Sequence, residues 1–322
     1  MAVYTKINLK TILSIENNYN IGKIIKFQGI KKGIENTNYF IKTKNKKFIL
    51  TIFEKRVNSK DLPFFMNLMS GLYKLKIKCP MPIKNRKGDY LFKIKHKQAC
   101  LVTFLDGKDK NELTVKDCFV VGKNIGKLHK ASKKLKIFRK NSMSINSWGP
   151  LLNKIDNRIN KVSKNLKNSM KNDLRDIKLK WPKKLPNGII HSDLFIDNIF
   201  FNKKKFLGYI DFYFSCNDFL AYELAICINA LCFKKKKRRF IFDKNKSKNL
   251  IKGYESIRKL NGSEKKYFNI LCRGSALRYL LTRAYDYLNT PKNAIIKIKD
   301  PREYIQKLNF HRQVNSYKNY IK

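Results

Sequence analysis

Three polar residues stand at a spacing that suits phosphoryl transfer. Asp193 follows an apolar run, and Asn198 comes five residues later. A second apolar run, Phe206–Ile210, leads into Asp211. Asp193 would accept the proton of an attacking hydroxyl, while Asn198 and Asp211 carry the hard oxygen ligands that Mg²⁺ needs beside nucleotide phosphates. The pattern predicts all three as catalytic residues, with Asn198 and Asp211 as metal ligands.

The distribution of charge also singles out this region. Lys and Arg number 72 of 322 residues, yet none occurs in Phe206–Phe233 or in Leu185–Asn202. Five of the 23 acidic residues lie in these two windows. Burial explains the apolar positions but not the carboxylates, which are rarely buried unless they are paired or bind metal. The alternative, a chance HxDxxxxN in a strand hairpin, leaves this concentration of carboxylates unexplained.

The formal net charge of +49 first suggests a nucleic-acid-binding protein. Only 13 of the 72 basic residues are Arg, however, and Lys, Asn and Ile are all abundant. A phosphate-reading surface more often uses Arg, whose planar fork binds phosphate through two bonds. We therefore interpret the Lys excess as drift on a solvated surface and expect no specific nucleic-acid partner.

Cysteine usage and hydropathy point to the cytoplasm. The seven cysteines are scattered in apolar runs without a CxxC pair, which is typical of reduced thiols. The first ten residues hold no apolar segment of the kind found in signal peptides. The longest apolar stretch, Phe219–Phe233, contains Glu223 and Asn229 and is too short to span a membrane.

The elements that would position these residues divide into two lobes. Five short runs rich in β-branched and aromatic residues predict strands at 24–27, 39–43, 48–53, 90–94 and 99–104. One helix interrupts them, with Asp61 as its cap, Pro63 in its first turn and Leu62, Phe65, Met69 and Leu72 on one face. After a polar break at 106–109, helical periodicity dominates, at 114–134, 149–166, 169–180 and 218–233. We predict an α+β protein with lobes at 1–105 and 106–322.

The chain after Asp211 favours a small substrate. Protein kinases place a long activation loop after their metal-binding aspartate. Here only six residues separate Asp211 from Asp218, which we expect to cap the next helix. This leaves no room for a peptide-docking loop, and Tyr213 stands where protein kinases have glycine.

Several longer blocks resemble one family. HSDLFIDNIFF, LGYIDFYFSCNDFLAYELAICINALCF, GIENTNYF, FILTIFEKR with DLPFF, and RGSALRYLLTRAYDYL look like the homoserine kinases of the aminoglycoside-phosphotransferase-like class, and the similarity extends from the N-terminal MAVYT to about Leu288. The resemblance implies a bilobal protein-kinase-like fold and Mg²⁺-dependent transfer of the ATP γ-phosphate to L-homoserine in threonine biosynthesis. We expect a monomer or small homo-oligomer. A kinase for another small hydroxyl substrate, such as choline or an aminoglycoside, is the alternative.

The predicted nucleotide-binding residues come from the first lobe. Gly29 and Gly33 lie between the first two strands, where such folds cover the phosphates, and Asn38 opens the next strand. Two glycines in a turn are equally compatible with a plain hairpin.

The third strand lacks the phosphate-binding lysine of protein kinases, because Thr51 stands in its place. Thr51, Phe53 and Lys55 share one face of a strand, so Lys55 or Arg56 could supply the missing charge. The alternative is that both are solvated at the strand end.

Two arginines in the apolar segment Ala276–Leu288 are the predicted substrate-binding residues. Arg278 and Arg283 could bind the carboxylate of an amino acid through their planar forks. For Arg283 an ion pair with Asp286, three residues away, is the alternative.

Other polar residues of interest receive structural roles. We expect His129 to be a packed, hydrogen-bonded helical residue and His191 to brace the catalytic loop. We expect Asp218 and Glu223 to buttress the loop and the start of the following helix.

Overall fold

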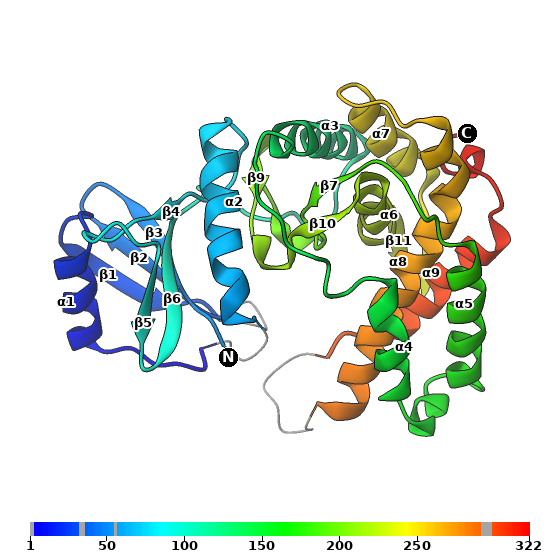
Figure 1. The fold of residues 1–322 in the computed structure, drawn as a ribbon, viewed down its shortest axis with the longest axis horizontal. Helices are drawn as coiled ribbons and strands as arrows, with labels where there is room; N and C mark the ends of the chain where they lie inside the picture. Colours follow the sequence, from blue (N-terminus) through cyan, green and yellow to red (C-terminus); the bar gives the residue numbers. More distant parts are fainter. Residues whose placement is uncertain (1–2, 32–35, 55–56, 291–297) are drawn as a thin grey trace. The chain divides into compact units, whose positions relative to one another are not determined.

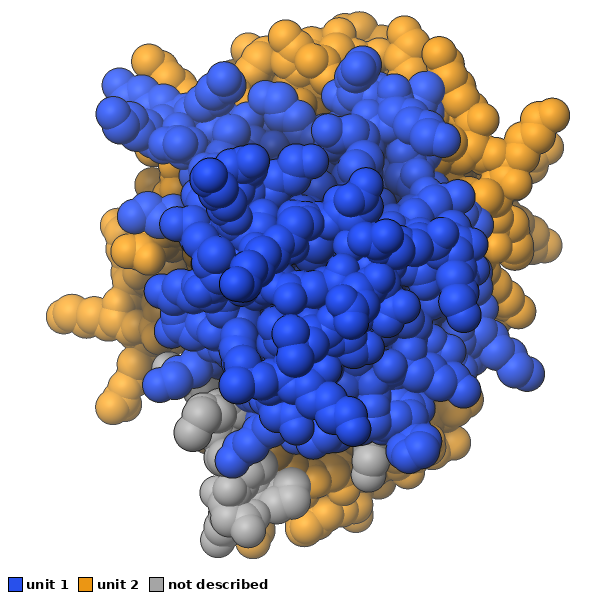
Figure 2. All heavy atoms as spheres, turned by 90° about the vertical axis from the view of Figure 1, so that its left-hand side faces the viewer, with its two compact units in different colours: residues 1–108, 200–213 blue, residues 109–199, 214–322 orange. Residues whose placement is uncertain are grey.

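The computed structural model describes residues 3–31, 36–54, 57–290 and 298–322 (Figure 1). The chain forms two compact units. Unit 1 contains residues 1–108 and 200–213, and unit 2 contains residues 109–199 and 214–322 (Figure 2). The first segment of unit 1 thus ends at residue 108, where the sequence predicted a boundary at 105, and unit 1 also includes residues 200–213.

Unit 1 is built on an antiparallel sheet in the order β1-β2-β3-β6-β4, with β5 paired to β6. The strands are β1 (Ile24–Gly29), β2 (Thr37–Thr43), β3 (Lys47–Ile52), β4 (Pro82–Ile83), β5 (Leu91–Ile94) and β6 (Lys97–Thr103). A hairpin of β8 (Ile199–Asn202) and β9 (Lys205–Tyr209) also belongs largely to this unit. The five predicted strands are confirmed.

Two helices flank this sheet, α1 (Leu9–Asn18) and α2 (Leu62–Lys74), and they lie on opposite sides of it (Figure 1). Ile15 of α1 and Tyr19, which follows the helix, share a core with apolar residues of the sheet. The predicted apolar face of α2 is confirmed, since all four of its residues are at most 2% exposed. Pro63 lies in the first turn, as expected, and Asp61 stands at the N-cap position, but its side chain makes no capping hydrogen bond to the helix.

Unit 2 is mainly helical. Its helices are α3 (Val115–Ser132), α4 (Ile145–Asn153), α5 (Leu166–Lys180), α6 (Leu220–Leu231), α7 (Lys244–Glu255), α8 (Gly262–Asn289) and α9 (Arg302–Gln313). Two short antiparallel pairs complete it, β7 (Asn187–Ile190) with β10 (Cys216–Phe219) and β11 (Phe233–Lys236) with β12 (Arg239–Phe242). The predicted α+β character, with a β-rich first part and a helical second part, is confirmed.

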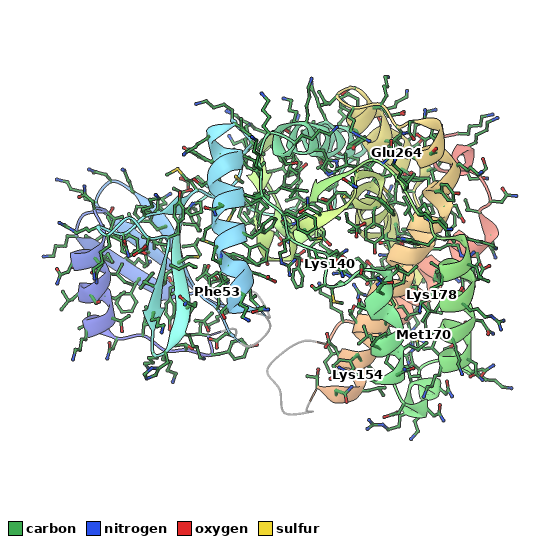
Figure 3. All side chains as sticks on the ribbon, in the orientation of Figure 1. Phe53, Lys140, Lys154, Met170, Lys178 and Glu264 are labelled. Atoms are coloured by element: carbon green, nitrogen blue, oxygen red, sulfur yellow. The ribbon has the colours of Figure 1, made fainter. Side chains whose placement is uncertain are left out.

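The core of unit 2 lies around α6, which is apolar on nearly every side and almost wholly buried. Beside it, α3 and α7 approach so closely that they touch through glycines. A Cβ on Gly122 would stand 1.9 Å from the carbonyl oxygen of Leu250, and one on Gly253 would stand 2.0 Å from that of Phe119. Only glycine allows this approach. By contrast Lys140, Lys154 and Lys178 are exposed, as expected for a solvated lysine surface (Figure 3).

Three segments differ from the sequence-based expectations. The N-terminal helix α1 was not predicted. The predicted helix 149–166 is instead α4 followed by the 3-10 helix Asn157–Lys161. The basic run 234–239, which has the composition of a short linker, forms the β11–β12 hairpin, because Phe233 and Phe242 pair directly across it. No helix of the described residues is long and apolar enough to cross a membrane.

Candidate functional site

The catalytic loop of unit 2 joins β7 to the 3-10 helix Ile196–Asn198. The structure brings Asp193 and Asn198 together within it. The Asn198 amide nitrogen Nδ2 donates to the backbone oxygen of Asp193 at 2.8 Å and to its carboxylate Oδ2 at 3.2 Å. Both bonds use the nitrogen of Asn198, so its oxygen Oδ1 is the atom that remains to act as a ligand. Asn198 can therefore offer its amide oxygen as a ligand to a cation.

A tyrosine from α8 completes the support of this loop. The Tyr279 hydroxyl donates to the backbone oxygen of Ser192 at 3.1 Å and reaches Asp193 Oδ1 at 3.4 Å. Ser192 has a φ of 66°, which is a left-handed conformation that costs a non-glycine residue about 1–2 kcal/mol. The ring of Tyr279 also packs edge-on against Phe195, with ring centroids 5.0 Å apart. Sequence reasoning did not identify Tyr279, which lies 86 residues from Asp193.

Glu223 of α6 forms hydrogen bonds with the backbone of the catalytic loop. Its carboxylate accepts hydrogen bonds from the backbone N–H groups of His191 and Ser192, the latter at 3.1 Å. The side chain is wholly buried and lies 3.8 Å from Nε2 of the equally buried His129. The expected buttressing role of Glu223 is therefore confirmed, with backbone amides as its partners.

His129 is the packed, hydrogen-bonded residue that the sequence predicts. Its Nδ1 lies 2.9 Å from the hydroxyl of Tyr254 on α7, and its side chain is fully buried. Burial lowers the pKa of the His129 imidazole, which favours the neutral ring.

The same arrangement shows that Asp218 does not cap α6. The helix begins at Leu220 with Phe219 as its N-cap residue, while Asp218 belongs to β10. Its carboxylate accepts bonds from the Asn141 amide at 2.6 Å and from the backbone N–H of Phe219 at 2.7 Å. Burial raises the pKa of Asp218. The capping prediction is wrong, because a strand pairing extends through the residue that would have started the helix.

The Asp193 carboxylate lies among charges of both signs. Burial raises its pKa, and the positive charges of Arg278, His191 and Lys299 oppose that rise. The residue keeps part of its surface accessible. Its environment is therefore that of a carboxylate that can both receive a proton and reach a bound substrate.

The two predicted substrate arginines differ in how they are paired. Arg278 is 4% exposed, its guanidinium lies 4.0 Å from the ring centroid of Tyr279, and its buried Nη1 forms no hydrogen bond within the described residues. Arg283 instead forms an ion pair with Glu303 at 2.6 Å and donates to the backbone oxygen of Asp300 at 3.3 Å. Arg283 is thus ion-paired, but with Glu303 of α9 and not in the pair with Asp286 that the sequence suggested.

Asp211 belongs to unit 1 and follows β9. Its φ is 64° and its side chain is exposed. The 3-10 helix Phe212–Phe214 and then β10 come directly after it, so the absence of a long activation loop is confirmed. Among the described residues no three His, Cys, Asp or Glu side chains cluster as a metal site. A cation bound by the Asp211 carboxylate would therefore need further ligands, such as nucleotide phosphate oxygens.

Tyr213, in the position of the kinase glycine, packs into unit 1. Its ring lies edge-on to Phe53 with centroids 4.9 Å apart and to Phe65 at 5.8 Å (Figure 3 labels Phe53). Burial raises the pKa of the Tyr213 hydroxyl. The residue that follows Asp211 by two positions therefore serves the packing of this unit.

The predicted nucleotide-binding residues lie on β1 and β2. Gly29 pairs with Tyr39, and a Cβ on it would stand 2.8 Å from the side chain of Val3. Asn38 accepts a hydrogen bond from Thr51 on β3 at 2.8 Å. The position of the missing kinase lysine is thus filled by a buried threonine that pairs across the sheet. Gly33, Lys55 and Arg56 lie outside the described residues.

Unit 1 also contains an ion pair that the sequence did not suggest. Glu54, just after β3, accepts bonds from the hydroxyls of Thr5 at 2.8 Å and Thr37 at 2.7 Å. It also pairs with the ammonium group of Lys97 on β6. Burial raises the pKa of Glu54, but Lys97 and the two hydroxyls outweigh that effect and lower it overall. This network links the N-terminal segment to β2 and β6.

Comparison with known proteins agrees with this geometry. Residues 26–244 match the phosphotransferase enzyme family. The chain is 40% identical over 320 residues to a homoserine kinase of Brucella anthropi (99% of this chain and 97% of that protein) and 41% identical to one of Xanthobacter autotrophicus (99% of both).

Solved structures show the same fold at low identity. An amicoumacin kinase in complex with AMP-PNP and Ca²⁺ matches with a TM-score of 0.72 at 13% identity, covering 96% of this chain and 93% of that one. A choline kinase from Cryptosporidium parvum matches at 0.67 and 16%, covering 95% of both chains. The fold is therefore that of small-molecule kinases, and the full-length identity of about two residues in five shows that this chain belongs to the homoserine kinases of the phosphotransferase enzyme family.

Proposed function

We propose that this protein transfers the γ-phosphoryl group of ATP to the side-chain hydroxyl of L-homoserine and so produces O-phospho-L-homoserine for threonine biosynthesis. The observation that carries the proposal is the Asp193 carboxylate, which Asn198 and Tyr279 hold in a partly accessible position. The charge of the buried Arg278 acts on this carboxylate, and Nη1 of Arg278 has no hydrogen-bond partner in the described part of the chain. The names and full-length similarity of the relatives support the same substrate.

In the proposed reaction Asp193 is the proton acceptor. The hydroxyl oxygen of homoserine forms a bond to the γ-phosphorus, and the bond from that phosphorus to the bridging oxygen of ADP breaks. The hydroxyl proton passes to a carboxylate oxygen of Asp193. The contact of Tyr279 with Oδ1 and that of Asn198 with Oδ2 restrict the rotation of this carboxylate. Orientation of the nucleophile is a main contribution of the protein in this chemistry.

We propose Asn198 and Asp211 as the residues that hold Mg²⁺, which supplies charge neutralisation at the phosphates when it is bound. The amide nitrogen of Asn198 is engaged by Asp193, which presents the amide oxygen to the cation. Asp211 contributes a carboxylate on an exposed side chain. We keep Gly29 and Asn38 as proposed nucleotide-binding positions of unit 1, together with Gly33 and Lys55 outside the described residues.

Arg278 distinguishes an amino-acid substrate from the alternative substrates. A buried guanidinium with an unsatisfied nitrogen is costly unless a ligand completes it. The carboxylate of homoserine would do so through the fork geometry of arginine. Choline carries no carboxylate and aminoglycosides are polycations, so neither would complete Arg278. Because Arg283 is already paired with Glu303, we assign the substrate carboxylate to Arg278 and a supporting role to Arg283.

We infer a cytoplasmic location from the cysteines. All seven are free and buried. Burial raises the pKa of the thiols, to about 12 for Cys79, Cys100 and Cys118, which keeps them protonated and unreactive. Such thiols are typical of a reducing compartment.

A substrate panel tests the proposed function. Purified protein with ATP and Mg²⁺ is offered L-homoserine, L-serine, choline and kanamycin, and ADP release is followed together with phosphorus NMR of the product. We expect turnover with homoserine and formation of its phosphate ester. Efficient turnover of choline or kanamycin with none of homoserine would overturn the proposal.

A further inference from the structure

A second cation lies beside the catalytic loop. The ammonium group of Lys299 stands 5.0 Å from the ring centroid of Phe195, whose own backbone N–H donates to the carbonyl of Asp193 at 2.9 Å. The positive charge of Lys299 also acts on the Asp193 carboxyl and opposes the rise that burial causes in its pKa. Lys299 is exposed, and within the described residues it forms no ion pair.

This position is fixed by the chain that follows it. Arg283 donates to the backbone oxygen of Asp300 and pairs with Glu303, and its guanidinium lies 4.4 Å from the ring centroid of Tyr304. Pro301, between these contacts, is buried. The segment that carries Lys299 is therefore anchored to α8 immediately after the lysine, and its charge is held at the loop although its side chain is exposed.

Phosphoryl transfer needs positive charge near the transferred group. Phosphoryl transfer spreads negative charge over the oxygens of the transferred group, and a positioned cation stabilises that charge. The third-strand lysine that protein kinases use is replaced by Thr51, whose hydroxyl is bonded to Asn38. Two cations from the C-terminal part of the chain act on Asp193. Arg278 of α8 is buried, whereas Lys299, in the segment before α9, is accessible.

We propose that Lys299 contacts the phosphoryl group during its transfer and is a catalytic residue of this enzyme. The inference rests on the proposed kinase function and adds a residue to its machinery. An exposed ammonium on a flexible stem suits a group that moves between two oxygens, because it acts as a point charge without a fixed fork. The buried, stacked guanidinium of Arg278 suits the stationary carboxylate of the substrate.

Two substitutions separate these roles. For Lys299→Met we expect kcat to fall about 100-fold, the usual loss when one preorganised charge or donor is removed, while the homoserine Kd changes less than twofold. For Arg278→Met we expect the homoserine Kd to rise at least tenfold, as calorimetry with the ADP-bound protein would show. Lys299→Arg should recover part of kcat because it restores the charge.

Controls make the comparison specific. Lys266→Met removes another exposed lysine that lies over an aromatic ring, that of Tyr267 at 5.7 Å, and should leave kcat unchanged. Circular dichroism and the urea midpoint should show that Lys299→Met remains folded. The slow transfer of the phosphoryl group to water, measured without homoserine, should fall by a similar factor in Lys299→Met.

The outcomes distinguish the two proposals. Absence of homoserine turnover in the unsubstituted protein would refute the proposed function, and the hydrolysis assay would still test Lys299. Unchanged kcat and unchanged hydrolysis in Lys299→Met would overturn the inference. So would a rise in the homoserine Kd equal to that of Arg278→Met, because Lys299 would then bind the carboxylate.

Discussion

Glu223 offers a sharp test of how the catalytic loop is held. The substitution Glu223→Ala removes the acceptor of two buried backbone N–H groups, those of His191 and Ser192. An unsatisfied buried donor costs about 1–3 kcal/mol, so the two together cost about 2–6 kcal/mol. Natural domains are stable by about 5–15 kcal/mol, and the loss is therefore a large share of the total.

The assay is urea unfolding followed by circular dichroism. We expect Glu223→Ala to lose about 4 kcal/mol in the free energy of unfolding. Glu223→Gln keeps one acceptor oxygen but turns an amide N–H₂ group toward a second donor, so it should lose about half as much. The turnover of both variants should fall, because the left-handed Ser192 beside Asp193 depends on the same carboxylate.

A matched control is Asp106→Ala, which breaks the ion pair of Asp106 with Lys47. The Asp106 side chain is 71% exposed, and exposed pairs are worth about 0–1 kcal/mol. If Glu223→Ala unfolds at the same urea concentration as this control, the two backbone bonds do not stabilise the loop and the reasoning is refuted.

Three further predictions concern the proposed active site and the surface charge. Asp193→Asn should fold normally but lose several orders of magnitude in kcat. Because burial raises the pKa of Asp193, the kcat of the unsubstituted enzyme should begin to fall, as the pH is lowered, at a pH above the usual pKa of an aspartate; a kcat that does not change with pH would contradict the base role. Asp211→Ala should weaken Mg·ATP binding more than homoserine binding, and Asn198→Ala should have the same but smaller effect, since an amide carries less charge than a carboxylate. If calorimetry shows unchanged Mg·ATP affinity in both variants, neither residue is a metal ligand. Nucleic-acid binding should be weak, independent of sequence and lost by about 0.15 M salt in a filter-binding titration, where tight, selective binding would reinstate the nucleic-acid interpretation.

The sequence determined the parts of this protein that depend on local spacing. The alternation of apolar residues predicted the five strands, and the repeat from Leu62 to Leu72 predicted the face of α2 that is buried. The five-residue interval between Asp193 and Asn198 predicted two side chains that the structure joins by a hydrogen bond. Periodicity and short intervals suffice here, because neighbours along the chain stay neighbours in space.

Local spacing failed where a neighbouring strand decides the outcome. Asp218 precedes an apolar helix and looks like its cap, but its pairing with Gly188 extends β10 past it. The basic run 234–239 is exposed, as its charge predicts, yet it forms strands, because Phe233 and Phe242 pair across the β11–β12 hairpin. Backbone pairing with a distant segment leaves no mark in the composition of either one.

Only the tertiary structure decided how charged groups are matched. Arg278 and Arg283 are both candidates in the sequence, but α9 brings Glu303 to Arg283, while Nη1 of Arg278 has no hydrogen-bond partner among the residues that the structure describes. Tyr279 and Lys299 come to Asp193 from positions more than eighty residues further along the chain. The physical reason is that the pairing of a buried polar group depends on which elements pack against it, and packing follows from the shape of the whole core.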